Sequence, residues 1–266
     1  MRSLIYRLTL ICLLAIPSLQ VQAGDSLQRV IDFKTLKVGM SGNQPPLTMI
    51  DKNGAPMGFD VDLAMALAVA MQVKLDIQVM PFGDLLDALE KDEVDMVISG
   101  LSITPQRTES ISFVGPYMMS GKSILTKRSA LGNAASTDVF DNENVTLMAL
   151  ENSTSAAFIR NSAPRAKLTE VESYNQGVKM LMEDKADALV ADMPMCILTV
   201  LRFPDAGFTT LEQPLTVEPI GIGISKDDLQ FQNLVDNYLD AYEKSGLLNK
   251  LRKKWFEDSS WVSRLP

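Results

Sequence analysis

The chain has 266 residues, 33 acidic and 25 basic side chains, and a formal net charge of −8. Such an acidic protein is a poor candidate for binding nucleic acid or an anionic membrane surface. It contains no histidine, which excludes Ser-His-Asp and Cys-His catalysis and the usual zinc sites. We therefore expect neither a metal nor another cofactor.

The first 23 residues have the order of a secretory signal peptide. Arg2 and Arg7 form a basic start, Leu8–Ile16 is apolar, and the small residue Ala23 precedes Gly24. The apolar stretch is shorter than the ~20 residues that span a bilayer, so a cleaved signal is favoured over an uncleaved anchor. After cleavage, Cys196 is the one cysteine that remains. Its apolar neighbours predict a buried thiol, and no internal disulfide is possible.

The first part of the mature chain alternates between strand and helix patterns. Apolar residues recur with the period of a helix in two segments and with the spacing of strands in three. The expected order is strand, helix, strand, helix, strand, over Leu36–Met40, Asp60–Met71, Lys74–Met80, Asp84–Lys91 and Val94–Ser99. This order predicts a parallel sheet covered by helices.

A second unit of the same kind follows. Its expected strands are Lys122–Lys127, Val145–Leu150 and Ala188–Val190, and its expected helices are Thr154–Asn161, Gln176–Asp184 and Pro194–Leu201. A late strand over Ile220–Ser225 and amphipathic helices over Leu229–Lys244 and Leu247–Phe256 complete the chain.

Two such units predict an α/β protein with two lobes, each a mostly parallel sheet flanked by helices. The apolar run 111–119 would leave the first lobe, and the region 214–219 would return to it. The predicted domains are residues 24–119 with 217–266 for the first lobe and the inserted residues 120–216 for the second. Open α/β sheets bind ligands at the carboxyl ends of their strands, so we expect the ligand in the cleft between the lobes.

Arg107 is the main candidate for a binding residue. It follows the hydroxyl-bearing residues Ser102 and Thr104 in the segment SGLSITPQR, which begins at Ser99. A loop arginine is more often a solvated surface charge, but a guanidinium beside hydroxyls and free amides suits a carboxylate. We predict that Arg107 holds a ligand carboxylate, with Gly100 and Ser102 nearby.

Asp192 ends the strand-like run ALVAD and precedes Met193-Pro194. Helix capping explains an aspartate in this position. If the side chain also points into the cleft, it supplies the negative charge that an ammonium group needs. The acidic residues Asp60 and Asp62 also open a predicted helix, and for these we favour a structural role at the helix N-terminus.

The segment 151–155, ENSTS, joins a strand end to a helix start. Capping by Ser153 or Thr154 explains it, and the free amides at the same place attract an anion. The two interpretations are compatible. Phe82 follows a strand and is either a core residue or a platform for a ligand.

These segments together resemble the periplasmic solute-binding proteins of polar amino-acid ABC importers, extracellular solute-binding protein family 3. The resemblance covers nearly all of the mature chain and rests on PPLTMIDKNGAPMGFDVDLA, SGLSITPQR with FVGPY, DKADALVAD and YEKSGLLNKLRKKW. It implies a two-lobed periplasmic-binding-protein fold of type II, a periplasmic location, an amino acid as ligand and a membrane permease as partner. It also implies a monomer that neither binds nucleic acid nor inserts into the membrane.

In that family, the arginine of the central motif holds the ligand carboxylate and the late-strand aspartate holds the amino group. The resemblance assigns these roles to Arg107 and Asp192. It adds a hydroxyl, an amide donor and an aromatic contact, which fall on Ser102, on Ser155 or Thr154, and on Phe82. The loop 41–47 lacks the aromatic residue that family members often carry there, so Asn43 or Gln44 is expected to offer a polar contact instead, and Glu151 is a candidate contact for a cationic side chain.

The chain also resembles cyclohexadienyl dehydratases, exported enzymes on the same scaffold that act on prephenate or arogenate. Those enzymes need a general acid, and they carry a glutamate three residues after the late-strand aspartate. Met195 occupies this position here and cannot donate a proton. We therefore expect a binding protein, with the dehydratase as the alternative. A sensor lobe of a membrane receptor is disfavoured because the residues after Phe256 are few and polar.

Overall fold

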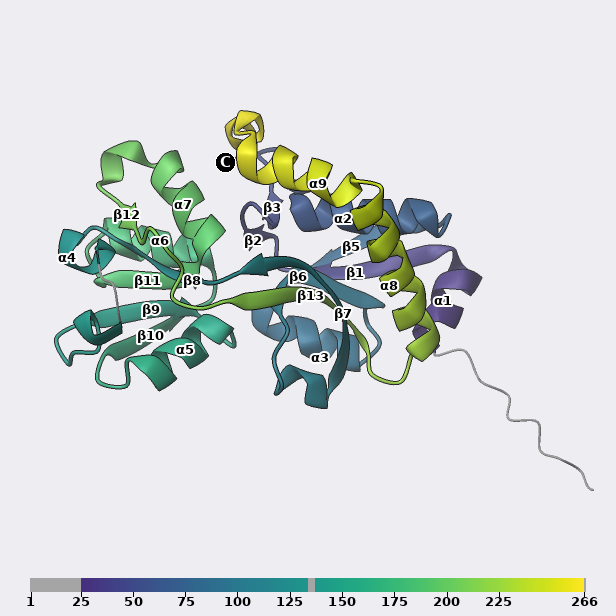
Figure 1. The fold of residues 1–266 in the computed structure, drawn as a ribbon, viewed down its shortest axis with the longest axis horizontal. Coiled ribbons are helices and arrows are strands. Elements are labelled where there is room, and N and C mark those ends of the chain that lie inside the picture. The colour runs from purple at the N-terminus through teal and green to yellow at the C-terminus, as the bar shows by residue number, and fades with distance from the viewer. Residues whose placement is uncertain (1–24, 134–136, 266) are drawn as a thin grey trace, which may run out of the picture.

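The computed structural model of the protein describes residues 25–133 and 137–265. It contains two five-stranded sheets, which lie side by side and are connected by two long strands (Figure 1). The predicted signal peptide, residues 1–23, lies outside the described residues.

The first sheet has the strand order β5-β1-β6-β13-β7. β1 pairs in parallel with β5 and β6, whereas β13 pairs antiparallel with β6 and β7. The bounds are Thr35–Met40 for β1, Lys74–Val79 for β5, Met96–Ser102 for β6, Ile111–Ser120 for β7 and Glu218–Ser225 for β13.

The second sheet has the order β10-β9-β11-β8-β12. β9 pairs in parallel with β10 and β11, and β8 pairs antiparallel with β11 and β12. The bounds are Lys122–Thr126 for β8, Thr146–Leu150 for β9, Lys167–Val171 for β10, Ala188–Asp192 for β11 and Thr209–Thr210 for β12. A small third sheet is formed by β2 (Asn43–Gln44), β3 (Thr48–Ile50) and β4 (Pro56–Met57).

Helices cover both large sheets. Those on the first sheet are α1 (Asp25–Phe33), α2 (Phe59–Ala70), α3 (Leu85–Glu90) and α8 (Leu229–Lys244), with α2 and α3 on opposite faces (Figure 1). α9 (Leu247–Arg252) packs on α2 and α8. Those on the second are α4 (Ser129–Gly132), α5 (Thr154–Ser162), α6 (Tyr174–Met182) and α7 (Met193–Arg202). Each sheet with its helices is called a lobe below.

Local chemistry explains where several helices begin. Ser153 accepts a hydrogen bond from the Ala156 amide at the start of α5, and Ser173 does the same for the Gln176 amide in α6. Asp228 accepts from the Phe231 amide at the start of α8 and also from the Leu27 amide of α1. Such caps satisfy amides that have no partner inside the helix.

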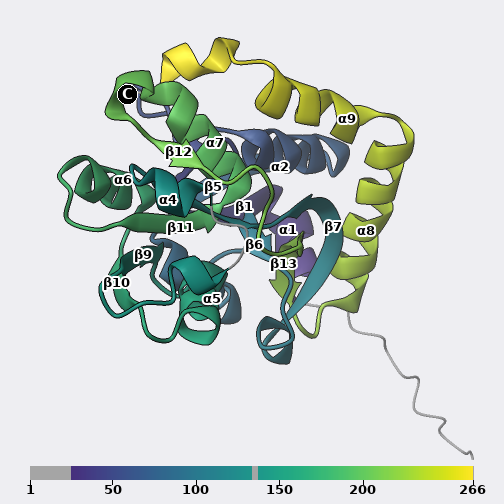
Figure 2. The ribbon, with the colours of Figure 1, turned by 60° about the vertical axis from the view of Figure 1, so that its left-hand side comes forward.

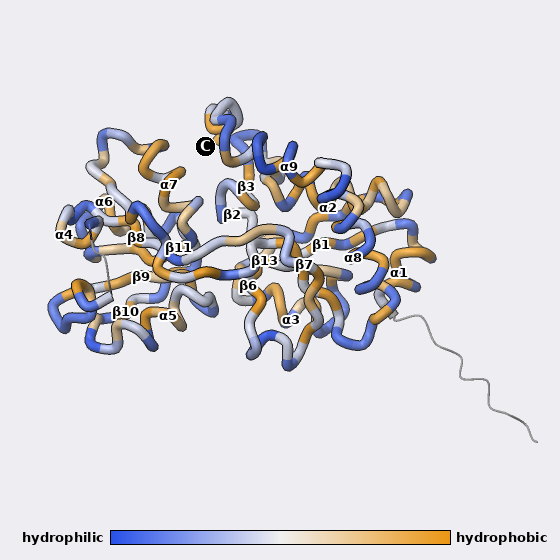
Figure 3. The backbone as a smooth tube through the Cα atoms, viewed as in Figure 1, coloured by the Kyte–Doolittle hydropathy of each residue, from blue (hydrophilic) through white to orange (hydrophobic). Residues whose placement is uncertain are grey.

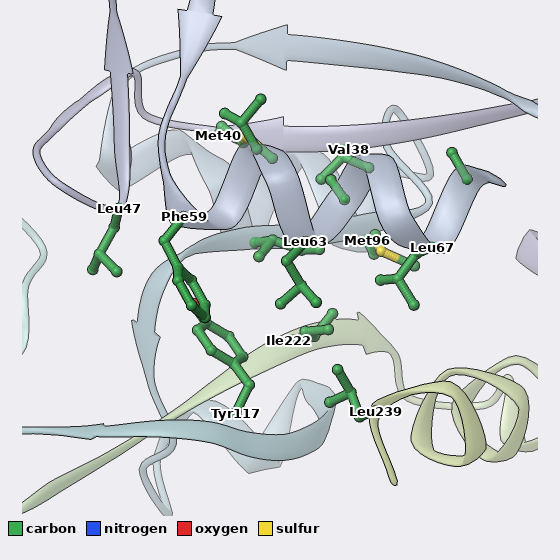
Figure 4. Packing of buried hydrophobic residues seen from close by; sticks show 14 of the residues in the cluster. Val38, Met40, Leu47, Phe59, Leu63, Leu67, Met96, Tyr117, Ile222 and Leu239 are labelled. Carbon is green, nitrogen blue, oxygen red and sulfur yellow. The ribbon is translucent and has the colours of Figure 1, made fainter. Parts of the chain in front are cut away.

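The core of the first lobe lies between its sheet and the helices α2 and α8. Phe59 stacks on Tyr117, with ring centroids 5.8 Å apart, beside Leu63, Ile222 and Leu239 (Figure 4). The strand β6 is buried over its whole length. Figure 3 shows the same pattern along the backbone, where β9 and α3 carry hydrophobic residues and the outer loops are mostly hydrophilic.

Two strands carry the chain from one sheet to the other. β7 belongs to the first sheet and β8 to the second, and Gly121 is the residue between them. β13, which starts at Glu218, pairs with β7 up to Ser120. Figure 2 shows β7 and β13 crossing between the lobes from a second direction. The carboxyl ends of β6 and β11 thus face the gap between the two lobes.

The structure confirms the two-lobed α/β fold and the predicted helices and strands to within a few residues. Each sheet is mixed, however, so the expected parallel arrangement describes only three strands of each. The sequence did not predict α1, α4, β10 or β12. The lobe boundaries 24–119, 120–216 and 217–266 stay a prediction.

Two further expectations concern single features. Cys196 is fully buried, as predicted, and burial raises the pKa of its thiol to about 12. Within residues 25–133 and 137–265, no helix combines the length and the apolar character that a bilayer crossing requires.

Candidate functional site

Asp192, the last residue of β11, lies where the two lobes meet. Its Oδ1 atom is 2.7 Å from the Lys122 ammonium nitrogen, and its Oδ2 atom accepts a hydrogen bond of 3.1 Å from the Gln44 side-chain amide. Gln44 comes from β2 next to the first sheet, so this contact joins the lobes. Although Asp192 immediately precedes α7, its side chain caps no helix amide. The capping interpretation was therefore wrong.

Lys122, the first residue of β8, is the least expected member of the site. Only 2% of it is exposed, and its ammonium group forms ion pairs with Asp192 and, at 3.1 Å, with Glu218. Ion pairs at such burial need further hydrogen bonds to offset the loss of hydration. Both carboxylates have such additional donors.

Glu218 is the first residue of β13 and accepts hydrogen bonds from both lobes. Its Oε2 atom accepts from the Ser102 hydroxyl at 2.7 Å and from the Thr154 hydroxyl at 3.1 Å, and Thr216 donates to Oε1 at 3.1 Å. Burial opposes ionisation of this carboxyl, but the Lys122 ammonium and the hydroxyl donors hold its pKa below the usual value. Glu218 is thus a carboxylate that stays charged.

Arg107 lies at the start of a short 3-10 turn after β6 and is half-buried. Its guanidinium donates to the Ser102 carbonyl at 2.9 Å and lies over the Phe82 ring, 5.7 Å from the ring centroid. Burial lowers the pKa of Arg107, and the charges of Glu218 and Asp192 act in the opposite direction. No carboxylate of the described residues forms an ion pair with Arg107.

Gly100 shapes the first-lobe side of the site. Its φ angle of +58° and its contact with Gln44, whose amide nitrogen would lie 2.8 Å from an added Cβ, both require glycine. The Gly100 amide donates to the Asp60 carboxyl at 2.7 Å, and the Tyr117 hydroxyl donates to the other Asp60 oxygen at 2.9 Å. Burial raises the pKa of Asp60 to about 7. Asp60 is structural, as expected, but it supports the loop of Gly100 instead of the amides of α2.

The start of α5 supplies the second-lobe side. Thr154 is the first residue of the helix, Ser155 is fully buried, and the Thr154 hydroxyl lies 3.4 Å from that of Ser102. Burial raises the pKa of the neighbouring Tyr174 well above its usual value, and Asp192 adds to the effect.

The structure therefore gathers the predicted residues around one charged cluster. Gln44 contacts Gly100 and Asp192, whereas Ser102 contacts Arg107 and Thr154, and Arg107 lies over Phe82. Lys122 and Glu218 connect the two groups, and Ser155 follows Thr154 in α5. Lys122 and Glu218, which connect the members of the cluster, were not predicted from the sequence. A charge at the first position of a strand with no other charged residue was the available signal for both.

Two cavities bordering Phe256 and Glu257 lie elsewhere. One, of about 590 Å³, is lined by Ile197, Leu198 and Leu201 of α7 and by Trp255 and Trp261 of the C-terminal segment. The other, of about 890 Å³, borders β7, α8 and Phe256. Neither is lined by Arg107 or Asp192, so these cavities are distinct from the charged cluster.

The cluster carries two cations and two anions, with hydroxyl and amide donors between them. Arg107 can grip a carboxylate with two parallel hydrogen bonds. The amides at the start of α5 favour an anion as well. Asp192 can accept from an ammonium group if that group replaces the Gln44 amide. The arrangement is suited to binding a small polar carboxylate between two lobes.

Comparison with known proteins identifies the class. Residues 36–258 match the bacterial extracellular solute-binding proteins, family 3, and the chain belongs to this family. Its fold is accordingly the two-lobed fold of periplasmic amino-acid-binding proteins.

The relatives include both enzymes and binding proteins. The chain is 27% identical to a cyclohexadienyl dehydratase of Pseudomonas aeruginosa, covering 96% of this chain and 95% of that one. It is 26% identical to the ABC transporter arginine-binding protein 1 of Escherichia coli, covering 83% and 90%.

The similar solved structures are likewise related to both classes of protein. An ancestral amino acid-binding protein, a precursor of cyclohexadienyl dehydratase, has a TM-score of 0.80 at 31% identity and covers 87% of this chain and 99% of its own. A binding component of an ABC transporter from Wolinella succinogenes, complexed with lysine, has a TM-score of 0.82 at 30% identity, with coverage of 86% and 99%.

Proposed function

We propose that the protein is the periplasmic substrate-binding component of an amino-acid ABC importer and that it binds a free amino acid in the cleft between its lobes. The observation that carries the proposal is the opposed charge of Arg107 and Asp192, which come from different lobes and share one cluster. Cleavage after residue 23, action as a monomer, a permease partner and the boundaries 24–119, 120–216 and 217–266 belong to the same proposal.

Binding would proceed by closure of the lobes. The ligand carboxylate docks on Arg107 beside Ser102 and Phe82, all of which belong to the first lobe. Closure brings Thr154 and Ser155 of α5 to the same carboxylate, and Asp192 to the ammonium group. Hinge closure of this kind is the known mode of periplasmic binding proteins, and the ligand stabilises the closed state because the second-lobe contacts exist only there.

The test is calorimetry with Arg107→Ala. Hydrogen bonds to charged groups contribute about 1.5–3 kcal/mol each, so the loss of two should weaken the binding of an amino acid by about 100-fold or more. A thermal-shift screen of the common amino acids identifies the ligand first. Arg160→Ala is the matched control, because Arg160 forms only an exposed ion pair with Glu170. Unchanged affinity in a folded Arg107→Ala protein would reject the proposal.

A second candidate is supported by the similarity to the cyclohexadienyl dehydratase. A dehydratase needs an acid that can protonate a leaving hydroxyl. Met195, at the position of the glutamate in those enzymes, is buried in α7 and has no proton to give, and Glu218 stays ionised. We therefore place binding first. Release of phenylpyruvate from prephenate by the purified protein would reverse this order.

A further inference from the structure

The Lys122 ammonium binds Asp192, the carboxylate proposed to hold the ammonium group of the ligand. Its nitrogen lies 2.7 Å from Oδ1 of Asp192 and 3.1 Å from Glu218, and the side chain is almost completely buried. Asp192 therefore has a permanent counter-ion from the protein itself. A ligand ammonium can reach only Oδ2, where it has to replace the neutral amide of Gln44.

The charges of the cluster add up to zero. Arg107 and Lys122 are positive, Asp192 and Glu218 are negative, and both carboxylates act on Arg107. An uncompensated charge taken out of water costs several kcal/mol unless a partner offsets it. A neutral cluster consequently favours a ligand whose own charges cancel.

We propose that Lys122 is a specificity-determining residue, which restricts the cleft to amino acids of zero net charge and disfavours cationic ones. The inference rests on the proposed function and names the ligand class of the same site. Without Lys122 the cluster would carry one excess negative charge, which a cationic amino acid such as arginine or lysine would neutralise. The Lys122 ammonium thus neutralises the negative charge that a second cation on the ligand would otherwise neutralise.

The experiment compares dissociation constants by calorimetry for the tightest neutral amino acid found in the screen and for arginine and lysine. We expect the wild-type protein to bind the cationic amino acids at least about tenfold more weakly. Lys122→Met removes the charge with little change in length, and it should shift the ratio toward the cationic amino acids by about tenfold or more. Lys127→Met, at the opposite end of β8, where Lys127 pairs with Asp184, should leave the ratio unchanged.

Glu218→Gln provides an independent test with the opposite sign. It leaves one excess positive charge, so it should improve binding of glutamate and aspartate relative to the neutral ligand by about tenfold. This variant keeps the proposal testable if Lys122→Met does not fold, since glutamine still accepts from Ser102. Circular dichroism and thermal unfolding establish that each variant is folded.

The outcomes separate this inference from the proposed function. If no amino acid binds the wild-type protein, the proposed function itself fails. If amino acids bind but arginine or lysine binds best, only the inference fails, and Glu151 becomes the candidate partner of the cationic side chain. Unchanged ligand ratios in both folded variants would also overturn the role of Lys122.

Discussion

A buried carboxyl group, Asp60, connects the core of the first lobe to the binding loop. It opens α2, which the sequence predicted, but its two oxygens bond to the Gly100 amide and the Tyr117 hydroxyl. These partners are 40 and 57 residues away in the chain. A local pattern can indicate that an aspartate starts a helix, but it carries no information on which distant donors the carboxyl will meet.

Asp60 should make the protein less stable as the pH rises toward neutrality. Burial raises its pKa from 3.8 to about 7, so the folded state retains a proton that the unfolded chain releases above pH ~4. The stabilisation is complete below that pH and is lost as the pH rises through about 7. With no histidine in the chain, urea unfolding should show a decrease of about 2 kcal/mol between pH 5 and pH 8.

The substitution Asp60→Asn should remove most of this slope, because asparagine has no proton to release and can still accept from Gly100. A smaller slope from Asp95 remains, since burial raises its pKa as well. Asp62→Asn, at a carboxyl that accepts from the Trp255 indole at the surface of α2, should keep the wild-type slope. Equal slopes in the wild-type and Asp60→Asn proteins would show that Asp60 does not hold a proton in the folded state.

At the scale of elements, the crossing between β7 and β8 positions the charged cluster. The Lys122 amide donates to the Thr216 hydroxyl at 2.9 Å, and the Leu215 amide donates to the Lys122 carbonyl at 2.7 Å. These bonds hold the segment before β13 against the start of β8. Because Lys122 and Glu218 stand at the starts of these two strands, the crossing determines how their charges meet.

Gly121 permits this close approach, and Gly121→Ala should disrupt it. A Cβ at this position would lie 2.0 Å from the Thr216 carbonyl oxygen, so the two backbones must move apart. We expect a loss of about 1–3 kcal/mol in the free energy of unfolding and weaker amino-acid binding, because Lys122 moves with the backbone. Chemical denaturation and calorimetry measure the two effects.

Ser120→Ala is the adjacent control. The Ser120 hydroxyl is buried without a hydrogen-bond partner in the described part of the chain, so its removal should change stability by less than about 0.5 kcal/mol. If Gly121→Ala unfolds with the free energy of the wild-type protein, the tight crossing has no energetic importance.

At the scale of the whole molecule, the two lobes touch at a second place besides the charged cluster. The C-terminal segment is fastened to the first lobe by the ion pair between Arg264 and Asp51 and by a hydrogen bond from the Lys52 amide to the Arg264 carbonyl. Its Trp261 faces Leu198 of α7 in the second lobe. This apolar contact should open and close together with the binding cleft.

The two tryptophans of the chain, Trp255 and Trp261, both lie at this contact, so their fluorescence should report closure. Saturation with the amino acid found in the screen should shift the emission to shorter wavelengths, because α7 excludes water from the indoles. A ligand at 100 times its dissociation constant should also add about 2.7 kcal/mol to stability. Arg107→Ala should show neither change. Binding seen by calorimetry without any change in emission would contradict closure at this contact.

The sequence by itself determined the order of helices and strands, because apolar periodicity and capping residues act over a few neighbouring positions. It also supplied the candidate residues Asp192, at the end of β11, and Arg107, in the turn after β6. The binding roles of these residues stay a prediction until the ligand is measured.

Only the tertiary structure decided which charges meet. Lys122 pairs with Asp192, which is 70 residues away in the chain, and Glu218 accepts a hydrogen bond from Ser102, which is 116 residues away. A buried charge without a partner is costly. Stable pairs therefore form where the packed strands bring two opposite charges within reach. The residue pattern around Lys122 predicts a strand but does not indicate that Asp192 is its partner. The balance of charges in the cleft therefore follows only from the folded structure.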